Sequence, residues 1–163
     1  MRSGPDFLPP ILNLSGLWKE ILGRLYSVFI HDFKSGMVKH LGCEVLFDKR
    51  ILADGDGKEE GFWHVVSRHD PKTGDRLIDY RRAERLPWAR PLMESSERPE
   101  IKVFDYIEGP KDKGLRRYIW LERYDYALIL QRKKKAFYWV TAFYIDIEWK
   151  REDMKKRFDR RLK

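Results

Sequence analysis

Four short segments in the last third of the chain constrain its fold most strongly. They are rich in aromatic and β-branched residues, which favour extended structure, and they cover residues 101–107, 118–122, 126–131 and 137–145. The connections between them are short, and consecutive strands with short connections pair antiparallel. The link at residues 132–135 has the length of a β-hairpin turn. The sequence therefore predicts an antiparallel sheet in this region.

Helical patterns mark three other segments. From about residue 15 to residue 33, apolar side chains recur at three- and four-residue spacings. A second helix is predicted at residues 75–84, with Asp75 as its cap. A third, highly charged helix is predicted at residues 149–161. Two more strands are predicted at the positions 44–47 and 62–67.

The remaining segments are expected to be irregular. Residues 1–14 contain three prolines and a glycine and are predicted to form a loose leader. Residues 86–93 contain Pro87 and Pro91, which disfavour regular structure there. The order of elements indicates the α+β class, with an N-terminal helix and further helices packed on a mainly antiparallel sheet of four or more strands. A length of 163 residues suits a single domain spanning residues 1–163.

Basic residues outnumber acidic residues. Lys and Arg total 34 against 26 for Asp and Glu, which gives a formal net charge of +8. Such an excess is expected of a protein that binds nucleic-acid phosphates. It is equally expected of a protein whose charged surface serves solubility, so the charge alone leaves both interpretations open.

Cysteine content and hydrophobicity bear on location and on cofactors. Cys43 is the one cysteine, so no disulfide can form within the chain, which is typical of a reducing compartment. No secretory signal is visible, and no apolar stretch approaches the ~20 residues needed to span a bilayer. No zinc spacing, phosphate-binding loop or dinucleotide fingerprint is present. We therefore expect a soluble, cytoplasmic protein with no membrane partner, no metal and no cofactor.

The segment from His64 to Arg68 is the first candidate site. On a strand, alternation places His64, Val66 and Arg68 on one face. There the imidazole could exchange a proton while the guanidinium supplies positive charge to a phosphate. His69 is an alternative functional histidine, because loops at strand ends often carry function. An ordinary surface pair of His and Arg remains the competing interpretation.

Arginines and a tryptophan form the second candidate. Arg81, Arg82 and Arg85 are followed by Trp88. Arginine binds phosphate through two parallel hydrogen bonds and stacks on bases. Ion pairs with nearby acidic residues would explain part of this arginine cluster equally well.

The last two strands carry further candidates. Arg132, Lys133 and Lys134 lie in the predicted hairpin link, where they serve either as phosphate anchors or as a solvated edge that prevents aggregation. Thr141 could donate a hydrogen bond to a phosphate oxygen, although threonine is also an ordinary strand residue.

These motifs resemble those of the barnase–EndoU–colicin–RelE superfamily of small ribonucleases, especially its phage- and prophage-encoded branches. The similar parts are His64-Val65-Val66-Ser67-Arg68, the arginines 81, 82 and 85, and Val140-Thr141-Ala142-Phe143-Tyr144, which together span about residues 60–145. Members of that superfamily combine N-terminal helices with a four-stranded antiparallel sheet. This chain departs from the pattern in the arginine-rich segment and Trp88 that separate the first motif from the main sheet.

The resemblance implies a metal-independent endoribonuclease, either a toxin or a phage-type nuclease, in which a ribose 2′-hydroxyl attacks the neighbouring phosphate. It implies His64 as general base or acid, and Arg68 with Arg82 or Arg85 as stabilisers of negative charge. It also implies Thr141 as the residue that positions a phosphate oxygen, and Tyr144 or Trp88 as a ring that stacks on a base. RNA and a cognate inhibitor protein would be its partners. A non-catalytic nucleic-acid-binding module and a protein-interaction module are the alternatives.

Overall fold

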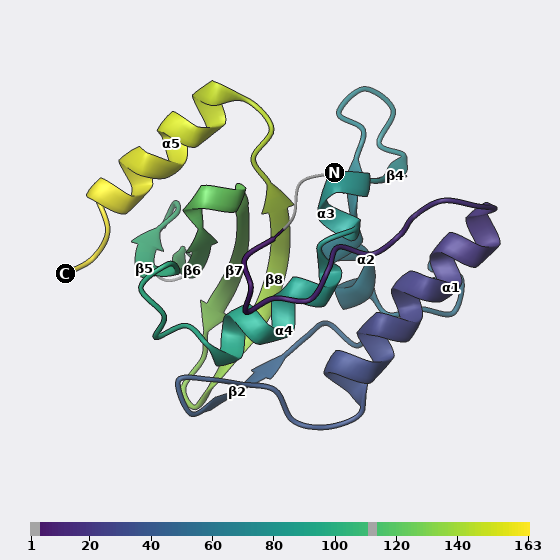
Figure 1. Ribbon diagram of the computed structural model, residues 1–163, viewed down its shortest axis with the longest axis horizontal. Helices are drawn as coiled ribbons and strands as arrows, with labels where there is room; N and C mark the ends of the chain where they lie inside the picture. Colours follow the sequence, from purple (N-terminus) through teal and green to yellow (C-terminus); the bar gives the residue numbers. More distant parts are fainter. Residues whose placement is uncertain (1–3, 111–113) are drawn as a thin grey trace.

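Residues 4–110 and 114–163 are described by the computed structural model, in which most strands form one six-stranded sheet (Figure 1). The strands lie in the order β1-β2-β8-β7-β6-β5. Their bounds are Lys39–His40 (β1), Cys43–Leu46 (β2), Lys102–Ile107 (β5), Leu115–Leu121 (β6), Tyr126–Arg132 (β7) and Ala136–Tyr144 (β8). Strands β5 to β8 pair antiparallel in sequence order, which confirms the four strands predicted in the last third.

The sheet is mixed rather than purely antiparallel. β2 runs parallel to β8, with Val45 opposite Phe137. Parallel neighbours need a long crossover connection, and residues 47–135 lie between these two strands in the sequence. The fold is α+β, as predicted. The parallel pair was not predicted, because it joins segments that are distant in the sequence.

Helices cover both faces of the sheet. Four of them contribute to the larger core on one face, and their bounds are Trp18–Phe29 (α1), Glu60–Val66 (α2), Tyr80–Ala83 (α3) and Leu86–Glu94 (α4). A π-helical turn, Ile30–Lys34 (η1), extends α1, and a 3-10 turn, Glu122–Tyr124 (η2), precedes β7. The fifth helix, Glu148–Asp159 (α5), packs against a smaller cluster on the opposite face, through Met154 and Phe158.

Residues 60–66 form helix α2 and not the strand predicted at 62–67. Phe62, Trp63, Val65 and Val66 are all buried, so this short helix is enclosed on most sides. Strand preference is weak and depends on context, and burial overrides it here. The chain becomes extended only at Ser67–His69 (β3). His64 and Arg68 therefore do not share the strand face that was predicted for them.

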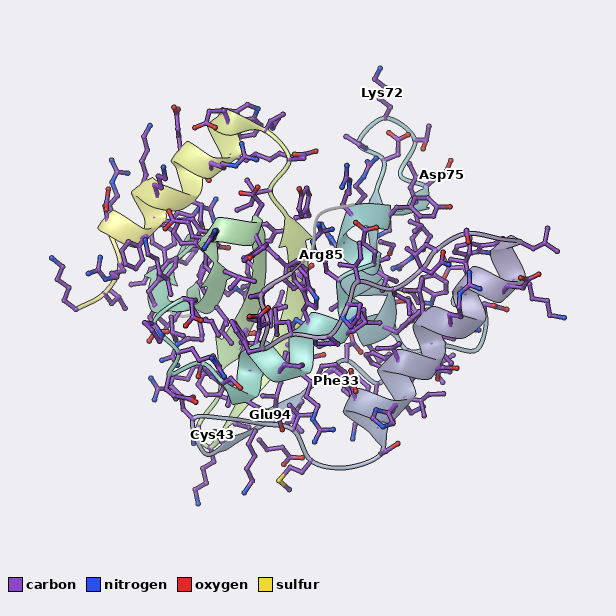
Figure 2. The ribbon with its side chains drawn as sticks, viewed as in Figure 1. Phe33, Cys43, Lys72, Asp75, Arg85 and Glu94 are labelled. Atoms are coloured by element: carbon purple, nitrogen blue, oxygen red, sulfur yellow. The ribbon has the colours of Figure 1, made fainter. Side chains whose placement is uncertain are left out.

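Residues 75–84 do not form one helix. They contain a second short strand, Arg76–Ile78 (β4), which pairs with β3, followed by α3. The cap of α3 is Asp79 and not the predicted Asp75. The Asp79 carboxylate accepts a hydrogen bond of 3.1 Å from the backbone N–H of Arg82. Figure 2 shows Lys72 at the tip of the β3–β4 hairpin, which projects from the rest of the molecule.

Two segments expected to be irregular or loose are ordered parts of the fold. Residues 86–93 belong to α4. Pro87 is tolerated there because it lies in the first turn of the helix, where a backbone N–H has no helical partner and its absence costs no hydrogen bond. The leader, as far as it is described, lies across α3 and α4 (Figure 1). Its Leu12 N–H donates to the Glu84 carbonyl at 2.7 Å, and its Leu8 is buried.

Candidate functional site

A cleft of about 570 Å³ lies beside the end of β8. One wall comes from the β3–α3 segment, the floor from the last residues of β8, and the other wall from α5. Figure 1 shows this end of β8 between α3 and α5. The residues that line it are Arg68, Asp79, Arg81 and Arg82, then Phe143, Tyr144 and Ile145, then Asp146, Trp149, Lys150, Asp153, Met154 and Arg157.

Five basic and three acidic side chains line this cleft. Each acidic residue has a basic partner within the cleft: the N–O distances are 3.6 Å for Arg82–Asp79, 3.2 Å for Lys150–Asp146 and 3.0 Å for Arg157–Asp153. Arg68 is exposed and forms no ion pair within the described part of the chain. Arg81 has 66% of its side chain exposed, with Glu84 3.9 Å away. The cleft therefore keeps a positive excess on its β3–α3 wall.

Aromatic side chains lie among these charges. Trp149 is 64% exposed at the start of α5, and the Lys150 ammonium lies 5.8 Å from the centre of its ring. On the floor, the Tyr144 ring has the Arg81 guanidinium at 5.6 Å and the Arg85 guanidinium at 4.3 Å. An exposed indole beside a cation can stack on a base while the cation meets its phosphate.

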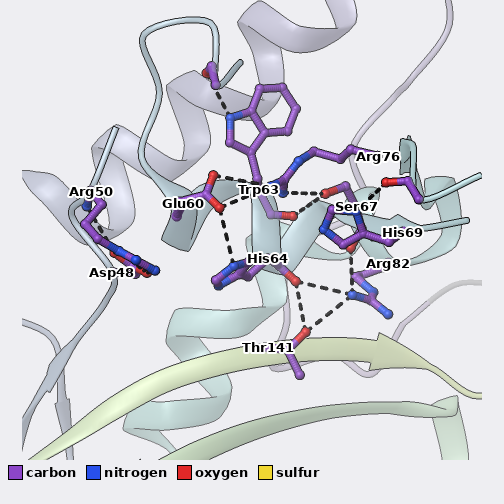
Figure 3. Close-up of polar contacts among 12 residues, drawn as sticks. Asp48, Arg50, Glu60, Trp63, His64, Ser67, His69, Arg76, Arg82 and Thr141 are labelled. Atoms are coloured by element: carbon purple, nitrogen blue, oxygen red, sulfur yellow. Dashed lines mark hydrogen bonds and ion pairs between the residues drawn. The ribbon is translucent and has the colours of Figure 1, made fainter. Parts of the chain in front are cut away.

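Arg82 and Thr141 lie together, as predicted for one site, but they meet at a backbone carbonyl (Figure 3). Arg82 Nη1 donates to the carbonyls of His64 at 3.2 Å and Ser67 at 2.9 Å, and to Thr141 Oγ1 at 3.3 Å. Thr141 Oγ1 also donates to the His64 carbonyl at 2.9 Å. These carbonyls lie at the C-terminal end of α2, where no helical partner remains. Both side chains thus join α2 to β8, and burial lowers the pKa of the Arg82 guanidinium.

The His64 imidazole lies away from Arg82 and Thr141, on the side of α2 that faces Asp48 and Arg50 (Figure 3). Its Nε2 lies 3.8 Å from Glu60 Oε1, and the Glu60 carboxylate also accepts a hydrogen bond of 3.1 Å from Arg76. Burial lowers the pKa of His64 below its usual value, and the nearby Glu60 carboxylate opposes this shift. His64 is therefore a half-exposed, neutral imidazole near pH 7 and does not line the cleft.

The alternative histidine does not line the cleft either. His69 is exposed at the end of β3, where its Nδ1 lies 3.1 Å from the Gly74 carbonyl.

Two predicted nucleic-acid contacts are buried. Arg85 and Trp88 are each 1% exposed, with the Arg85 guanidinium 5.3 Å from the Trp88 ring. Arg85 donates to the Arg81 carbonyl at 2.8 Å and to Glu84 at 2.7 Å, and Trp88 donates to the Pro9 carbonyl at 2.8 Å. Figure 2 places Arg85 where the leader crosses α3 and α4. Neither side chain can reach a base or a phosphate in this arrangement, so these two assignments are corrected.

The hairpin tip does not belong to the cleft. Arg132, Lys133 and Lys134 are exposed before the start of β8, while the cleft adjoins its end. The nine residues of β8 separate these two regions, which corresponds to about 27 Å of extended chain.

The α5 wall was missed by sequence reasoning. Trp149, Lys150 and Arg157 lie in a segment that was predicted only as a charged helix. The sequence did contain one signal of this wall, the tryptophan at the start of the charged helix. A buried ring would need an apolar helix face around it, and this helix has none in its sequence, so the ring was to be expected at the surface.

Comparisons with protein-family models, with curated proteins and with solved structures found no match to this chain. Within residues 4–110 and 114–163, no group of three or more His, Cys, Asp or Glu side chains is arranged to hold a metal ion. Over the same residues, no helix combines the length and apolar character that crossing a bilayer requires.

Proposed function

We propose that this protein binds single-stranded RNA in the cleft between the β3–α3 segment and α5. The observation that carries this proposal is the pairing of two exposed arginines on one wall, Arg68 and Arg81, with exposed Trp149 and Lys150 on the other. Arginine and lysine bind phosphates and release counterions, and aromatic rings stack on unpaired bases.

The acidic residues of the cleft favour RNA over DNA. Asp79, Asp146 and Asp153 would repel a phosphate but can accept a hydrogen bond from a ribose 2′-hydroxyl. Each of the three is ion-paired with a basic neighbour, so both walls present hydrogen-bond donors and acceptors to a strand in the cleft. A duplex would hide its bases from Trp149 and Tyr144, which supports a single-stranded ligand.

Equilibrium binding of a fluorescently labelled single-stranded RNA tests the proposal. The variant Arg68→Ala/Lys150→Ala removes one exposed charge from each wall and breaks no contact of the core. We expect it to weaken binding at least about tenfold at 0.1 M salt, since two phosphate contacts are lost. The control Lys19→Ala/Lys39→Ala makes the same charge change at exposed positions of α1 and β1 and should bind within about twofold of the wild type. Equal weakening in both variants would contradict a site in the cleft.

Metal-independent cleavage of RNA is the second candidate function. The observation that favours it is the half-exposed imidazole of His64, held near Glu60 and alongside Asp48 and Arg50. A neutral imidazole can take the proton of a 2′-hydroxyl, and a neighbouring guanidinium can stabilise the phosphorane.

The same labelled RNA, separated by length on a gel after incubation with a metal chelator, tests this second function. Shortened products that vanish in His64→Ala but persist in His69→Ala support His64 as the acid or base. RNA that stays intact with the wild-type protein would contradict cleavage and leave the binding proposal unaffected.

A further inference from the structure

One row of residues crosses the sheet on the face that carries α5. The strand register places Tyr106 opposite Arg116, Arg116 opposite Gln131, and Gln131 opposite Tyr138. Directly paired residues share a face of the sheet, so these four side chains form one row across β5, β6, β7 and β8. We call it the open row. All four residues are half-buried.

The adjoining positions confirm which face the open row occupies. Arg117, next to Arg116, points to the other face, where its Nη1 lies 3.1 Å from Nε2 of buried His40. Phe137 and Trp139, on either side of Tyr138, belong to the larger core on that other face. Tyr138 therefore points to the face of α5.

α5 covers the rows nearer the cleft and contacts the open row through Arg157, which lies over the Tyr106 ring. Phe158 packs against Phe104 and Trp120, with ring centres 5.2 Å and 6.2 Å apart. Those two residues are buried, and so is Tyr118 between them in the sheet. The open row lies beyond them toward the β7–β8 hairpin.

Cations lie at both ends of the open row. The Lys133 ammonium is 5.9 Å from the centre of the Tyr138 ring, and the Arg157 guanidinium is 5.6 Å from that of Tyr106. Arg116 supplies a third basic side chain between the two rings. Basic groups that alternate with aromatic rings on a sheet are the arrangement that tracks phosphates while bases stack.

The open row is continuous with the cleft. Arg157 lines the cleft and also lies over the Tyr106 ring. Phe143 lines the cleft too, and together with Val140 it packs on the face of α5 along the same strand as Tyr138. A strand of RNA that leaves the cleft along β8 would meet Tyr138 next, with Lys133 at the hairpin tip beyond it.

We propose that the open row is a base-stacking platform that extends the RNA-binding site, with Tyr138 and Tyr106 as its stacking rings. This inference rests on the proposed function and enlarges its footprint from the cleft to the hairpin tip. Lys133 lies outside the cleft, and in the enlarged site it would bind a phosphate of the RNA. The ligand is a single strand long enough to reach both regions.

Binding of a 20-nucleotide single-stranded RNA by Tyr138 variants tests the platform. Tyr138→Phe keeps the ring and should bind as the wild type does, whereas Tyr138→Ala should bind about fivefold more weakly or worse. Trp18→Ala, which removes an exposed ring from α1, should leave affinity unchanged. Photocrosslinking of wild-type protein to the same RNA, followed by sequencing of the crosslinked peptide, should mark Tyr138 or Tyr106 and does not depend on the folding of a variant.

The outcomes separate the platform from the cleft. If Arg68→Ala/Lys150→Ala loses affinity while Tyr138→Ala binds as the wild type does and neither tyrosine crosslinks, the open row is no RNA platform and the cleft proposal stands. If the wild-type protein binds no RNA, both proposals fail, and this aromatic face would then suit a protein partner.

Discussion

At the scale of single residues, His40 shows how burial fixes a protonation state. It is fully buried, with Nδ1 3.0 Å from the Met93 carbonyl and Nε2 3.1 Å from Arg117 Nη1. A carbonyl only accepts and a guanidinium only donates, so Nδ1 carries the proton and Nε2 is bare. Burial, with the charge of Arg117 in addition, lowers the pKa of His40. The ring is neutral in the folded protein.

This protonation state predicts a dependence of stability on pH. Below pH ~6.5 the unfolded chain binds a proton at His40, whereas the folded protein keeps this ring neutral. The free energy of unfolding should therefore fall as pH falls, by up to about 1.4 kcal/mol per pH unit for each such histidine. Urea denaturation at pH 7.5 and pH 5.5 measures the loss, and His40→Gln should make it smaller. An unchanged loss in that variant would contradict the buried neutral state.

Four of the candidate residues named from the sequence, Arg68, Arg81, Arg82 and Tyr144, line one cleft. The sequence placed them in three separate segments, and their roles in binding or catalysis stay predictions. Arg85 and Trp88 were also candidates, yet both are buried, and Trp88 donates a hydrogen bond to Pro9 of the leader. Exposure depends on which distant segment packs above a side chain, and no local pattern reports it.

At the scale of elements, α2 is a segment whose local sequence favours a strand but whose backbone contacts favour a helix. The Gly61 N–H donates to the Asp48 carbonyl at 2.9 Å, and the Glu60 N–H donates to the Arg50 carbonyl at 2.8 Å. The segment after β2 thus satisfies free N–H groups at the start of this helix. Strand preference in valine and tryptophan predicted the wrong element, because these contacts come from elsewhere in the sequence.

Gly61 lets the backbone of α2 approach the backbone at Asp48, and this close approach predicts how substitution of Gly61 changes stability. A Cβ at Gly61 would lie 3.0 Å from both the N and the O of Asp48, so Gly61→Ala should lower the free energy of unfolding by about 1–3 kcal/mol despite the higher helix propensity of alanine. Gly23→Ala in α1 meets nothing within 4 Å and should raise stability by about 0.5–1 kcal/mol. Urea denaturation compares them, and a stabilised Gly61→Ala protein would show that the approach is not tight.

At the scale of the whole molecule, the predicted sheet was confirmed where its pairing is local. β5 to β8 follow one another with short connections, and their order could be predicted from the sequence. The parallel pairing of β2 with β8 and the packing of α5 on the second face depend on long-range contacts. The cleft arises from those contacts, since α5 supplies one of its walls.

Part of the excess positive charge of the chain lies at two places on the surface of the folded molecule. Acidic residues neutralise part of the cleft, while Arg68 and Arg81 remain exposed on its β3–α3 wall and Lys133 and Lys134 at the hairpin tip. A surface whose charge serves only solubility would bind RNA without preference for any of these positions.

The salt dependence of single-stranded RNA binding tests the central claim most directly. For single strands, the logarithm of the affinity falls with the logarithm of the salt concentration by about 0.7 per phosphate neutralised. We predict a clear negative slope for the wild-type protein, and a slope shallower by about 1.4 for Arg68→Ala/Lys150→Ala because two contacts are removed. Identical slopes in the two proteins, or binding that does not respond to salt, would contradict a phosphate-binding cleft.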